Sequence, residues 1–406
     1  MSDSPASPQQ TTCCIAGGGP AGMMLGFLLA RSGVTVAVLE KHKDFFRDFR
    51  GDTIHPSTLE LLYELGLLDD FLAIPHQEIR ELHGMIGGQE FPMADFTHLP
   101  THSKFIALMP QWDFLNFLAA QAAKLPSFRL LLEHEVTDLI EESGRVVGVR
   151  ANTPSGPMEM RASLVVGCDG RHSNARASAH LRVIDHGAPI DVLWFRISRR
   201  DGDPETALGN FNYGTGLILI NRGDYFQCGF IIAKDSLETQ LQPAGLPALR
   251  ETIVRVVPFL ADRVAKITSW DQLKLLSVQV NRLERWHLPG LLCIGDAAHA
   301  MSPVGGIGIN LAIQDAVAAA KILAAPLART FVTEIHLAHV QHRRELPTRI
   351  TQGFQVMIHG FLKRFLGHPD AIQPPLMLRL LTPHPIFRRA IARFVGMGVR
   401  PEHIRG

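Results

Sequence analysis

Residues 15–22, near the amino terminus, constrain the fold more than any other part of the sequence. They read IAGGGPAG, in which three glycines match the pattern G-x-G-x-x-G. A β-prone apolar run at 11–16 precedes them, and Pro20 occupies a position that the first turn of a helix tolerates. The pattern predicts a strand, a tight turn and a helix.

Each of the three glycines has its own physical task. Gly17 permits the turn, Gly19 lets the backbone approach a pyrophosphate without an intervening Cβ, and Gly22 lets the helix lie close to the strand. The amino terminus of the helix then faces the phosphates with its partial positive charge. The alternative is a glycine-rich turn in an ordinary βαβ unit.

A second buried strand follows this helix and ends in an acid. Residues 31–33 provide a helix stop, and residues 34–39, VTVAVL, read as a buried strand that ends at Glu40. An acid at this distance from the glycines is expected to bind a ribose hydroxyl. The glycines, the two strands, the helix and Glu40 together predict a dinucleotide site.

Length and charge limit the classes of function. The chain has 406 residues, more than a single core usually serves, so two domains are expected. It has 46% hydrophobic and 19% charged residues and a net charge of +1. This composition is typical of a soluble globular protein and indicates no affinity for nucleic acid. No segment is expected to be long and apolar enough to span a bilayer.

The amino terminus and the cysteines favour a cytoplasmic protein. Residues 1–10 are rich in Ser, Pro and Gln and lack an apolar core, so we expect a disordered leader rather than a signal peptide. The 5 cysteines are scattered, and we expect buried free thiols in a reducing compartment. The 19 histidines show no metal-ligand spacing, so no metal is predicted.

Two further buried strands end in an aspartate beside a glycine. Residues 164–168 lead into Asp169, and residues 290–295 lead into Asp296. Open α/β sheets place ligands at the carboxyl ends of their parallel strands, so we expect both aspartates at one sheet edge. The glycine-rich loop 303–308 then opens an alanine-rich helix and forms a second cradle, for a phosphate or a ring.

Residues 181–276 differ in character from their flanks. Strand-like runs separated by turns, with one helix at 247–257, predict an antiparallel sheet. In the first run Leu193, Phe195 and Ile197 alternate with other residues and are expected in the core. Candidate pocket residues in this sheet are Trp194, Arg196, Tyr213, Phe226 and Gln227.

Shorter elements lie between Glu40 and this sheet. Ser57 and Glu60 match a capping box, which predicts a helix from Ser57 to about Leu68. Residues 75–100 resemble a hairpin insertion.

In combination these motifs resemble the three fingerprints of class A FAD-dependent monooxygenases of the para-hydroxybenzoate hydroxylase type. They are residues 17–22 with Glu40, the stretch 168–170, and residues 295–316, in that order. The resemblance covers roughly residues 10–345. It implies an α/β fold with a Rossmann-like FAD-binding domain (GR2-type), an inserted antiparallel-sheet substrate domain and a helical C-terminal segment.

The resemblance also implies a reaction. One FAD would be bound, NAD(P)H would reduce it, and oxygen from O₂ would be inserted into an aromatic or polycyclic organic substrate through a flavin C4a-hydroperoxide. Alternatives are an epoxidase, halogenase or reductase of the same fold, or a non-catalytic flavin-binding protein. The Trp-x-Trp-x-Ile-Pro signature of halogenases is absent.

Individual cofactor contacts follow only from this resemblance. Arg50 and Gln111 match positions near the FAD phosphates and ribityl chain, Val136 would lie by its backbone near the adenine, and Asp296 would bind ribityl or ribose hydroxyls. Asp169 belongs to a motif associated with both FAD and NAD(P)H. The predicted cofactor-binding residues are Gly17, Gly19, Pro20, Ala21, Gly22, Glu40, Lys41, Arg50, Gln111, Val136, Asp169, Asp296, Gly306, Gly308, Ile309 and Asn310.

The second glycine loop departs from the family pattern. Family members often carry Gly-Gln-Gly where this chain has Gly-Ile-Gly at 306–308, and Pro-Pro where it has Ser-Pro at 302–303. Both differences fall on the side of the flavin that would face the substrate. No acid/base pair is assigned, because the chemistry is centred on the flavin. The substrate-side candidates are Pro303, Val304 and Gly305.

The expected domain division is discontinuous. After the leader, the FAD-binding domain comprises 11–75, 101–180 and 277–345, the substrate domain comprises 76–100 and 181–276, and a helical segment comprises 346–406. Residues 343–406 carry eleven Lys and Arg against three Asp and Glu. A covering helix with a solvated face is favoured over contact with an acidic membrane. We expect a monomer or homodimer.

Overall fold

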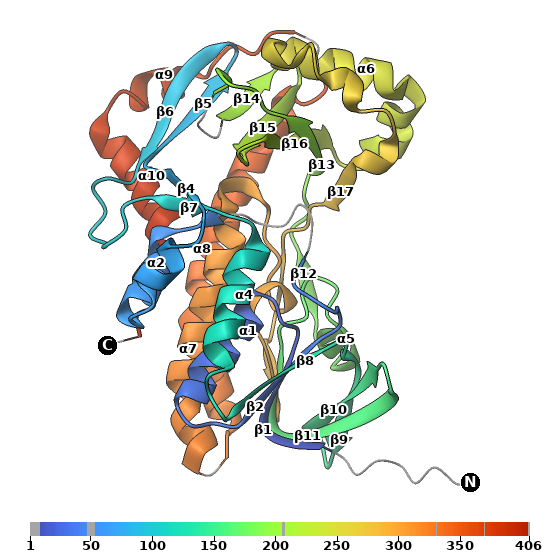
Figure 1. The fold of residues 1–406 in the computed structure, drawn as a ribbon, viewed down its shortest axis with the longest axis vertical. Helices are drawn as coiled ribbons and strands as arrows, with labels where there is room; N and C mark the ends of the chain where they lie inside the picture. The colour runs from blue at the N-terminus through green and yellow to red at the C-terminus, as the bar shows by residue number, and fades with distance from the viewer. Residues whose placement is uncertain (1–8, 47–52, 205–207, 330, 369, 405–406) are drawn as a thin grey trace.

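Two sheets lying end to end organise the molecule (Figure 1). The computed structural model describes residues 9–46, 53–204, 208–329, 331–368 and 370–404. A largely parallel sheet forms the lower part of Figure 1 and a largely antiparallel sheet forms the upper part, with long helices beside both. The predicted α/β fold with a helical C-terminal segment is confirmed.

Five parallel strands form the centre of the lower sheet. Their order is β20-β11-β1-β2-β8, with β19 antiparallel to β20 at one edge. The carboxyl ends of the parallel strands therefore share one edge, which faces the upper part (Figure 1). The strands are β1 (Gln9–Ala16), β2 (Val36–Glu40), β8 (Phe128–Leu132), β11 (Gly156–Gly167), β19 (His287–Leu288) and β20 (Leu291–Cys293).

An antiparallel meander covers the second face of this sheet. It consists of β9 (Glu135–Glu142), β10 (Arg145–Thr153) and the first half of β11. The buried strand expected at 164–168 is the second half of β11, which runs from Gly156 without a break because no Gly or Pro interrupts residues 158–166.

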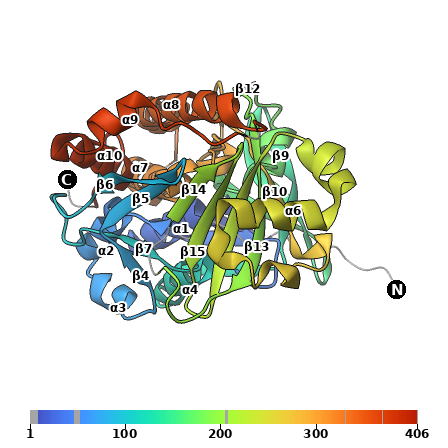
Figure 2. The ribbon, with the colours of Figure 1, turned by 90° about the horizontal axis from the view of Figure 1, so that it is seen from above.

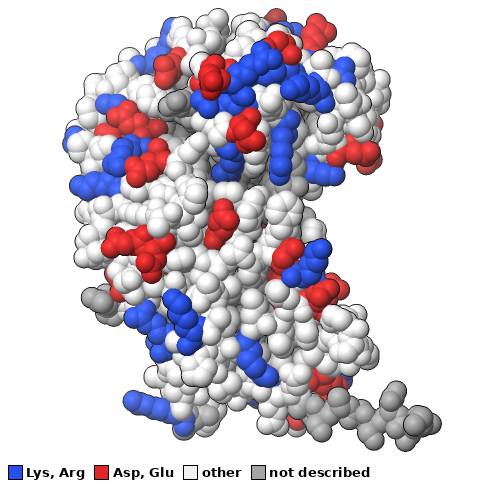
Figure 3. Space-filling model, viewed as in Figure 1, with Lys and Arg blue, Asp and Glu red and all other residues white. Residues whose placement is uncertain are grey.

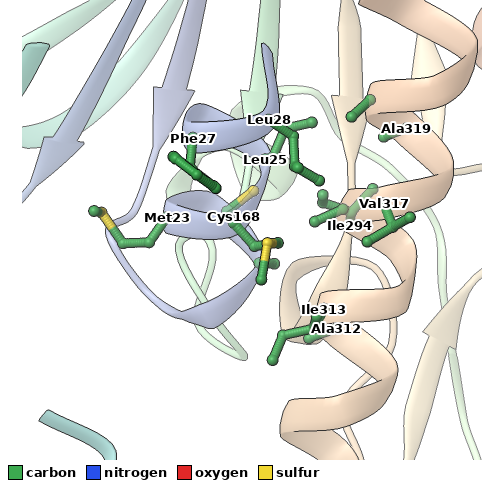
Figure 4. Packing of buried hydrophobic residues seen from close by; sticks show 14 of the residues in the cluster. Met23, Leu25, Phe27, Leu28, Cys168, Ile294, Ala312, Ile313, Val317 and Ala319 are labelled. Carbon is green, nitrogen blue, oxygen red and sulfur yellow. The ribbon is translucent and has the colours of Figure 1, made fainter. Parts of the chain in front are cut away.

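Three helices pack on the first face: α1 (Pro20–Arg31), α4 (Gln111–Ala122) and α7 (Ile307–Arg329). Figure 4 shows Leu25 and Leu28 of α1 and Ile313 and Val317 of α7 in the space between the two helices. Contrary to expectation, one stretch, Val304–Arg329, is long and apolar enough to cross a membrane by length and composition. Its apolar window is 67% buried inside the protein, as in the core helix of a globular domain.

The upper sheet contains seven strands in the order β17-β13-β16-β15-β14-β5-β6. The hairpin expected within 75–100 forms β5 and β6, and β5 pairs in parallel with β14. α6 (Gln242–Val256) covers the face that carries Leu193, Phe195 and Ile197, which form the predicted core. The strands are β5 (Glu81–Ile86), β6 (Gln89–Asp95), β13 (Ile190–Ser198), β14 (Leu208–Asn212), β15 (Thr215–Asn221), β16 (Tyr225–Ala233) and β17 (Lys274–Ser277).

Small elements join the two parts. α2 (Pro56–Glu64) begins one residue before the predicted start and has His55 as its N-cap, so the capping-box prediction for Ser57 is wrong. Pro56 takes the first helical position, and Glu60 instead accepts the backbone N–H of His102 at 2.9 Å. The others are α3 (Leu68–Leu72), α5 (Asn174–Ser178), the sheet of β3 (Thr53–Ile54), β4 (Gln77–Ile79) and β7 (Ile106–Leu108), and the pair β12 (Val183–Asp185) and β18 (Asn281–Leu283).

The C-terminal helices are α8 (Glu334–Phe365), α9 (Leu376–Leu381) and α10 (Pro385–Met397). α8 packs along α7 and continues upward past the second sheet (Figure 1). Its inner face carries buried polar side chains, which is unusual for a covering helix and indicates specific partners. They are Arg344, Thr348, Thr351, Gln352, Gln355 and His359.

β1 begins at Gln9, inside the expected leader, while residues 1–8 lie outside the described part of the chain. All five cysteines are buried and free, as predicted. On the face in Figure 3, Lys and Arg are interspersed with Asp and Glu, and this face has no broad basic field of the kind that binds nucleic acid.

Candidate cofactor and substrate site

A cavity of about 900 Å³ lies at the carboxyl edge of the lower sheet and extends along the upper sheet. This volume falls within the range of small-molecule and cofactor sites. Gly22 and Asn310 do not line it, and Arg50 lies outside the described residues. The predicted residues that line it are Gly17, Gly19, Pro20, Ala21, Glu40, Lys41, Gln111, Val136, Asp169, Asp296, Pro303, Val304, Gly305, Gly306, Gly308 and Ile309.

The first glycine loop is tight where the chain packs and open where it faces the cavity. A Cβ on Gly17, whose φ is 101°, would lie 2.5 Å from the carbonyl oxygen of Cys168. A Cβ on Gly22 would lie 2.0 Å from the carbonyl oxygen of Gly17. A Cβ on Gly19 would meet no atom of the residues that the structure describes within 4 Å. The amino terminus of α1 is thus open on the side where a phosphate group would sit.

Glu40 holds the loop as well as facing the cavity. One carboxylate oxygen accepts the backbone N–H of Gly18 at 2.9 Å, and the other accepts that of His42 at 3.1 Å. The acid at the end of β2 therefore sets the position of the glycine turn.

Asp169 carries an unsatisfied buried acceptor. Its Oδ2 accepts the backbone N–H of Ala175 at 3.1 Å, whereas Oδ1 is buried and has no hydrogen-bond partner among the described residues. Burial raises the pKa of Asp169, although hydrogen bonds from Ser173 and the backbone act in the opposite direction. A buried acceptor of this kind at a cavity wall can accept a hydrogen bond from a bound ligand.

Asp296 faces a cation that the sequence analysis did not select. It lies in the 3₁₀ turn Gly295–Ala297, and its Oδ2 is 3.6 Å from Nη2 of Arg171. Arg171 also lines the cavity and donates from Nη1 to the carbonyl oxygen of Ser277 at 3.1 Å. In the sequence, Arg171 could have been recognised as a site residue from its position directly after Asp169-Gly170, at the end of a strand.

The second glycine loop is clamped against β3. Gly305 and Gly306 have φ of 77° and 62°, and a Cβ on Gly306 would lie 2.2 Å from Oγ1 of Thr53. Asn310, in the first turn of α7, accepts the backbone N–H of His55 at 2.9 Å and the hydroxyl of Thr58 at 2.7 Å through Oδ1. The side chain of Asn310 thus anchors α2, and it lies outside the cavity wall.

The histidine and aspartate of the third fingerprint form a buried charged cluster. His299 Nε2 is 2.6 Å from Asp315 Oδ2, and Arg344 donates from Nε to Asp315 Oδ1 at 3.0 Å. Asp315 also accepts the backbone N–H of Gly295 at 3.1 Å. Burial alone would raise the pKa of Asp315, but its partners His299 and Arg344 lower it. The cluster therefore fixes the turn Gly295–Ala297, from which Asp296 faces the cavity.

α8 supports the loop 300–304 from behind. Gln355 accepts the backbone N–H of Ser302 at 3.0 Å and donates to its carbonyl oxygen at 3.0 Å. One turn further, His359 Nε2 lies 2.8 Å from the hydroxyl of Ser302, and burial lowers the pKa of His359. Gln352 donates to the carbonyl oxygen of Ala300 at 3.2 Å. The conformation of the loop 300–304 is therefore fixed by contacts from α8, a segment that is distant in the sequence.

The upper end of the cavity is apolar. Of the candidate pocket residues in the sheet, Trp194 lines it; Phe226 packs in the core under α6, and Arg196, Tyr213 and Gln227 are not in the wall. The contribution of α8 and α10 to this wall could not be predicted from the sequence, because no local pattern indicates which helix faces reach the sheet. Apolar wall residues include Ile79, Leu82, Met93, Ile190, Val192, Phe211, Ile218, Ile220, Ile231, Phe354, Ile358, Leu362, Ile391 and Val395.

Comparison with known proteins decides the family. The model of the FAD binding domain family matches residues 10–353. The chain belongs to the class A FAD-dependent monooxygenases. This monooxygenase is 32% identical over 405 residues to 6-methylpretetramide 4-monooxygenase of Streptomyces rimosus, an alignment that covers 96% of this chain and 93% of the relative.

Solved structures share the fold of this monooxygenase. PqsL, a probable FAD-dependent monooxygenase from Pseudomonas aeruginosa, superimposes with a TM-score of 0.74 at 22% identity, over 88% of this chain and 98% of PqsL. OxyS anhydrotetracycline hydroxylase from Streptomyces rimosus gives a TM-score of 0.74 at 23% identity, over 97% of this chain and 77% of OxyS.

The cofactor of this monooxygenase is FAD, and NAD(P)H is the usual co-substrate of such enzymes. The residues present fit FAD, since the cradle at Gly19 is open and Asp169 offers an unsatisfied acceptor. Among the described residues, no group of three or more His, Cys, Asp or Glu could hold a metal ion.

Proposed function

We propose that this monooxygenase hydroxylates a neutral polycyclic aromatic substrate of the tetracycline type. The observation that carries the proposal is the continuity of the cavity, which joins the glycine cradle to a large apolar pocket. Relatives named for 6-methylpretetramide and for anhydrotetracycline support this class of substrate.

The charge distribution along the cavity wall supports a neutral substrate. The wall residues of β5, β6 and β13–β17 include a single titratable side chain, His83, among the residues that the structure describes. A benzoate would need a cation there, whereas a fused aromatic ring system needs apolar surface with few polar anchors.

We propose that the lower end of the cavity holds FAD. Gly17, Gly19 and the amino terminus of α1 would face the pyrophosphate, Glu40 and Lys41 the adenosine ribose, and the backbone of Val136 the adenine. Gln111 and Asp296 would contact the ribityl side, with Gly306, Gly308 and Ile309 beside the ring. Bound FAD supplies electron transfer from NAD(P)H and the activation of O₂.

The remaining tasks fall to the chain itself. The loop 303–305 lines the cavity and would position the substrate, and the upper sheet with α8 and α10 would exclude water. This assignment supports the division proposed from the sequence, with 76–100 and 181–276 as the substrate domain. The structure of α8 and α10 adds residues of 346–406 to the same pocket.

The proposed function is tested by measuring whether a substrate stimulates NAD(P)H oxidation and gains an oxygen atom. The purified protein, loaded with FAD, is mixed with NADH or NADPH and with 6-methylpretetramide, anhydrotetracycline or para-hydroxybenzoate. We expect faster NAD(P)H oxidation with a polycyclic compound and a product that gains one oxygen atom. Stimulation by the benzoate alone, or H₂O₂ as the sole product with every compound, contradicts the proposal.

We further propose that the enzyme works in the cytoplasm as a monomer or homodimer. Five free buried thiols support a reducing compartment. Light scattering of the purified protein distinguishes these states from a tetramer.

A further inference from the structure

The C-terminal helices expose several large apolar side chains to solvent. On α9, Leu376, Met377 and Leu380 are 68%, 67% and 58% exposed, and Ile386 in the first turn of α10 is 81% exposed. Large apolar residues exposed singly are ordinary, but four within eleven positions on two consecutive helices are a concentration of the kind found at interaction sites.

The same surface is basic. Residues 371–401 contain five arginines and no Asp or Glu. Arg379, Arg389 and Arg393 are exposed on the same two helices as the apolar residues, and Lys363 and Arg364 are exposed at the end of α8. Among the described residues, Lys363, Arg364, Arg379, Arg389 and Arg393 form no ion pair with a carboxylate, although Arg379 donates to Oε1 of Gln89 at 3.5 Å and Arg389 Nη2 lies 3.0 Å from Nε2 of His98. We call Leu376, Met377, Leu380 and Ile386 with these five cations the α9–α10 surface.

The position of this surface relates it to the cavity. Figures 1 and 2 place α9 and α10 beside the end of α8, on the outside of the upper part. The opposite faces of α8 and α10 carry Ile358, Leu362, Ile391 and Val395, which line the apolar end of the cavity. One layer of helices therefore separates the α9–α10 surface from the substrate pocket.

We infer that the α9–α10 surface binds an anionic lipid bilayer. Apolar side chains enter the interface while neighbouring cations attract acidic headgroups, and neither feature alone would be sufficient. A second copy of the chain fits less well, since a twofold interface would place five cations against the same five. The sequence favoured a solvated covering helix, but it could not show that these apolar side chains point outward.

This binding has a consequence for the substrate. A polycyclic aromatic compound partitions into lipid, and docking through the α9–α10 surface brings the pocket to that reservoir. The consequence rests on the proposed function, whereas lipid binding does not, and the two are measured separately.

Vesicle flotation tests the inference with the FAD-loaded full chain and no substrate. One set of vesicles contains phosphatidylcholine alone and the other an equimolar mixture with phosphatidylglycerol. We expect the bound fraction to be at least about tenfold higher on the anionic vesicles and to fall as salt is raised. Equal binding to both sets, or none, overturns the inference.

Two variants locate the contact. Met377→Glu with Leu380→Glu should reduce binding to the level seen with phosphatidylcholine, while circular dichroism and Tm stay unchanged because both side chains are exposed. The matched control is Phe331→Glu with Ile335→Glu, 62% and 67% exposed near the start of α8, which should bind as wild type does. Equal loss in the control, or a wild-type dimer that the α9 variant dissociates, overturns the inference.

Discussion

At the scale of single residues, the glycines of the two cradles serve two different purposes. Gly17, Gly22 and Gly306 are glycines because a Cβ would collide with the fold, whereas Gly19 is glycine although a Cβ would meet open space. The first group is therefore structural, and the second keeps room for a ligand.

This difference predicts opposite effects for two alanine substitutions. Gly22→Ala should lower the free energy of unfolding by about 1–3 kcal/mol or more, because its Cβ would overlap the Gly17 carbonyl. Gly19→Ala should leave the apo-protein within about 0.5 kcal/mol of wild type and weaken FAD binding. Urea unfolding measures the change in the free energy of unfolding, and flavin-fluorescence titration measures the change in FAD affinity. A destabilised Gly19→Ala protein with normal FAD affinity contradicts the assignment.

The buried carboxylate of Asp169 is expected to lower the stability of the apo-protein while it contributes to ligand binding. Its pKa is raised above 3.8, so its ionisation opposes folding at pH values above the folded pKa and has no effect below 3.8. Asp169→Asn should therefore raise the Tm of the apo-protein at about pH 7, and the gain should vanish on acidification. Differential scanning fluorimetry across pH measures this. Asp296→Asn, less buried, is the control and should give no such gain.

At the scale of elements, α2, α7, α8 and α10 are held by polar contacts between segments far apart in sequence. His55 at the start of α2 lies 2.8 Å from the carbonyl oxygen of Val395 through Nδ1, and Asn310 of α7 holds the backbone of His55. These contacts fix the helices that border the cavity, so their loss should open the site.

The His55 contact predicts an acid-sensitive step. Burial lowers the pKa of His55 from 6.5 to about 4, so the stability that the neutral ring contributes is complete above pH 6.5 and is lost as pH falls towards 4. The loss should reach up to about 1.4 kcal/mol per pH unit. His55→Asn keeps a donor for Val395 and cannot titrate, so urea unfolding should show a shallower pH dependence. An unchanged slope contradicts this role.

At the scale of the whole molecule, the cavity separates two packed parts that α8 links. Cofactor binding should then stabilise the fold by mass action. With free FAD at about 100 times its Kd, the free energy of unfolding should rise by about 2.7 kcal/mol, which thermal unfolding of apo- and FAD-loaded protein measures. A Tm independent of FAD would contradict binding to the folded chain, and AMP serves as a control ligand for the lower end alone.

The sequence by itself determined the parallel core, the glycine turn and the acids at strand ends, because these depend on local periodicity and on backbone conformations that few residues adopt. It assigned Asn310 to cofactor binding and gave His299 and Asp315 no role, since a polar side chain looks the same in the sequence whether it contacts a ligand or a distant helix. Only the tertiary structure shows the contacts that these three side chains make, joins 346–406 to the pocket and exposes the α9–α10 surface. Each depends on which helix faces meet, and that is set by packing between segments hundreds of residues apart.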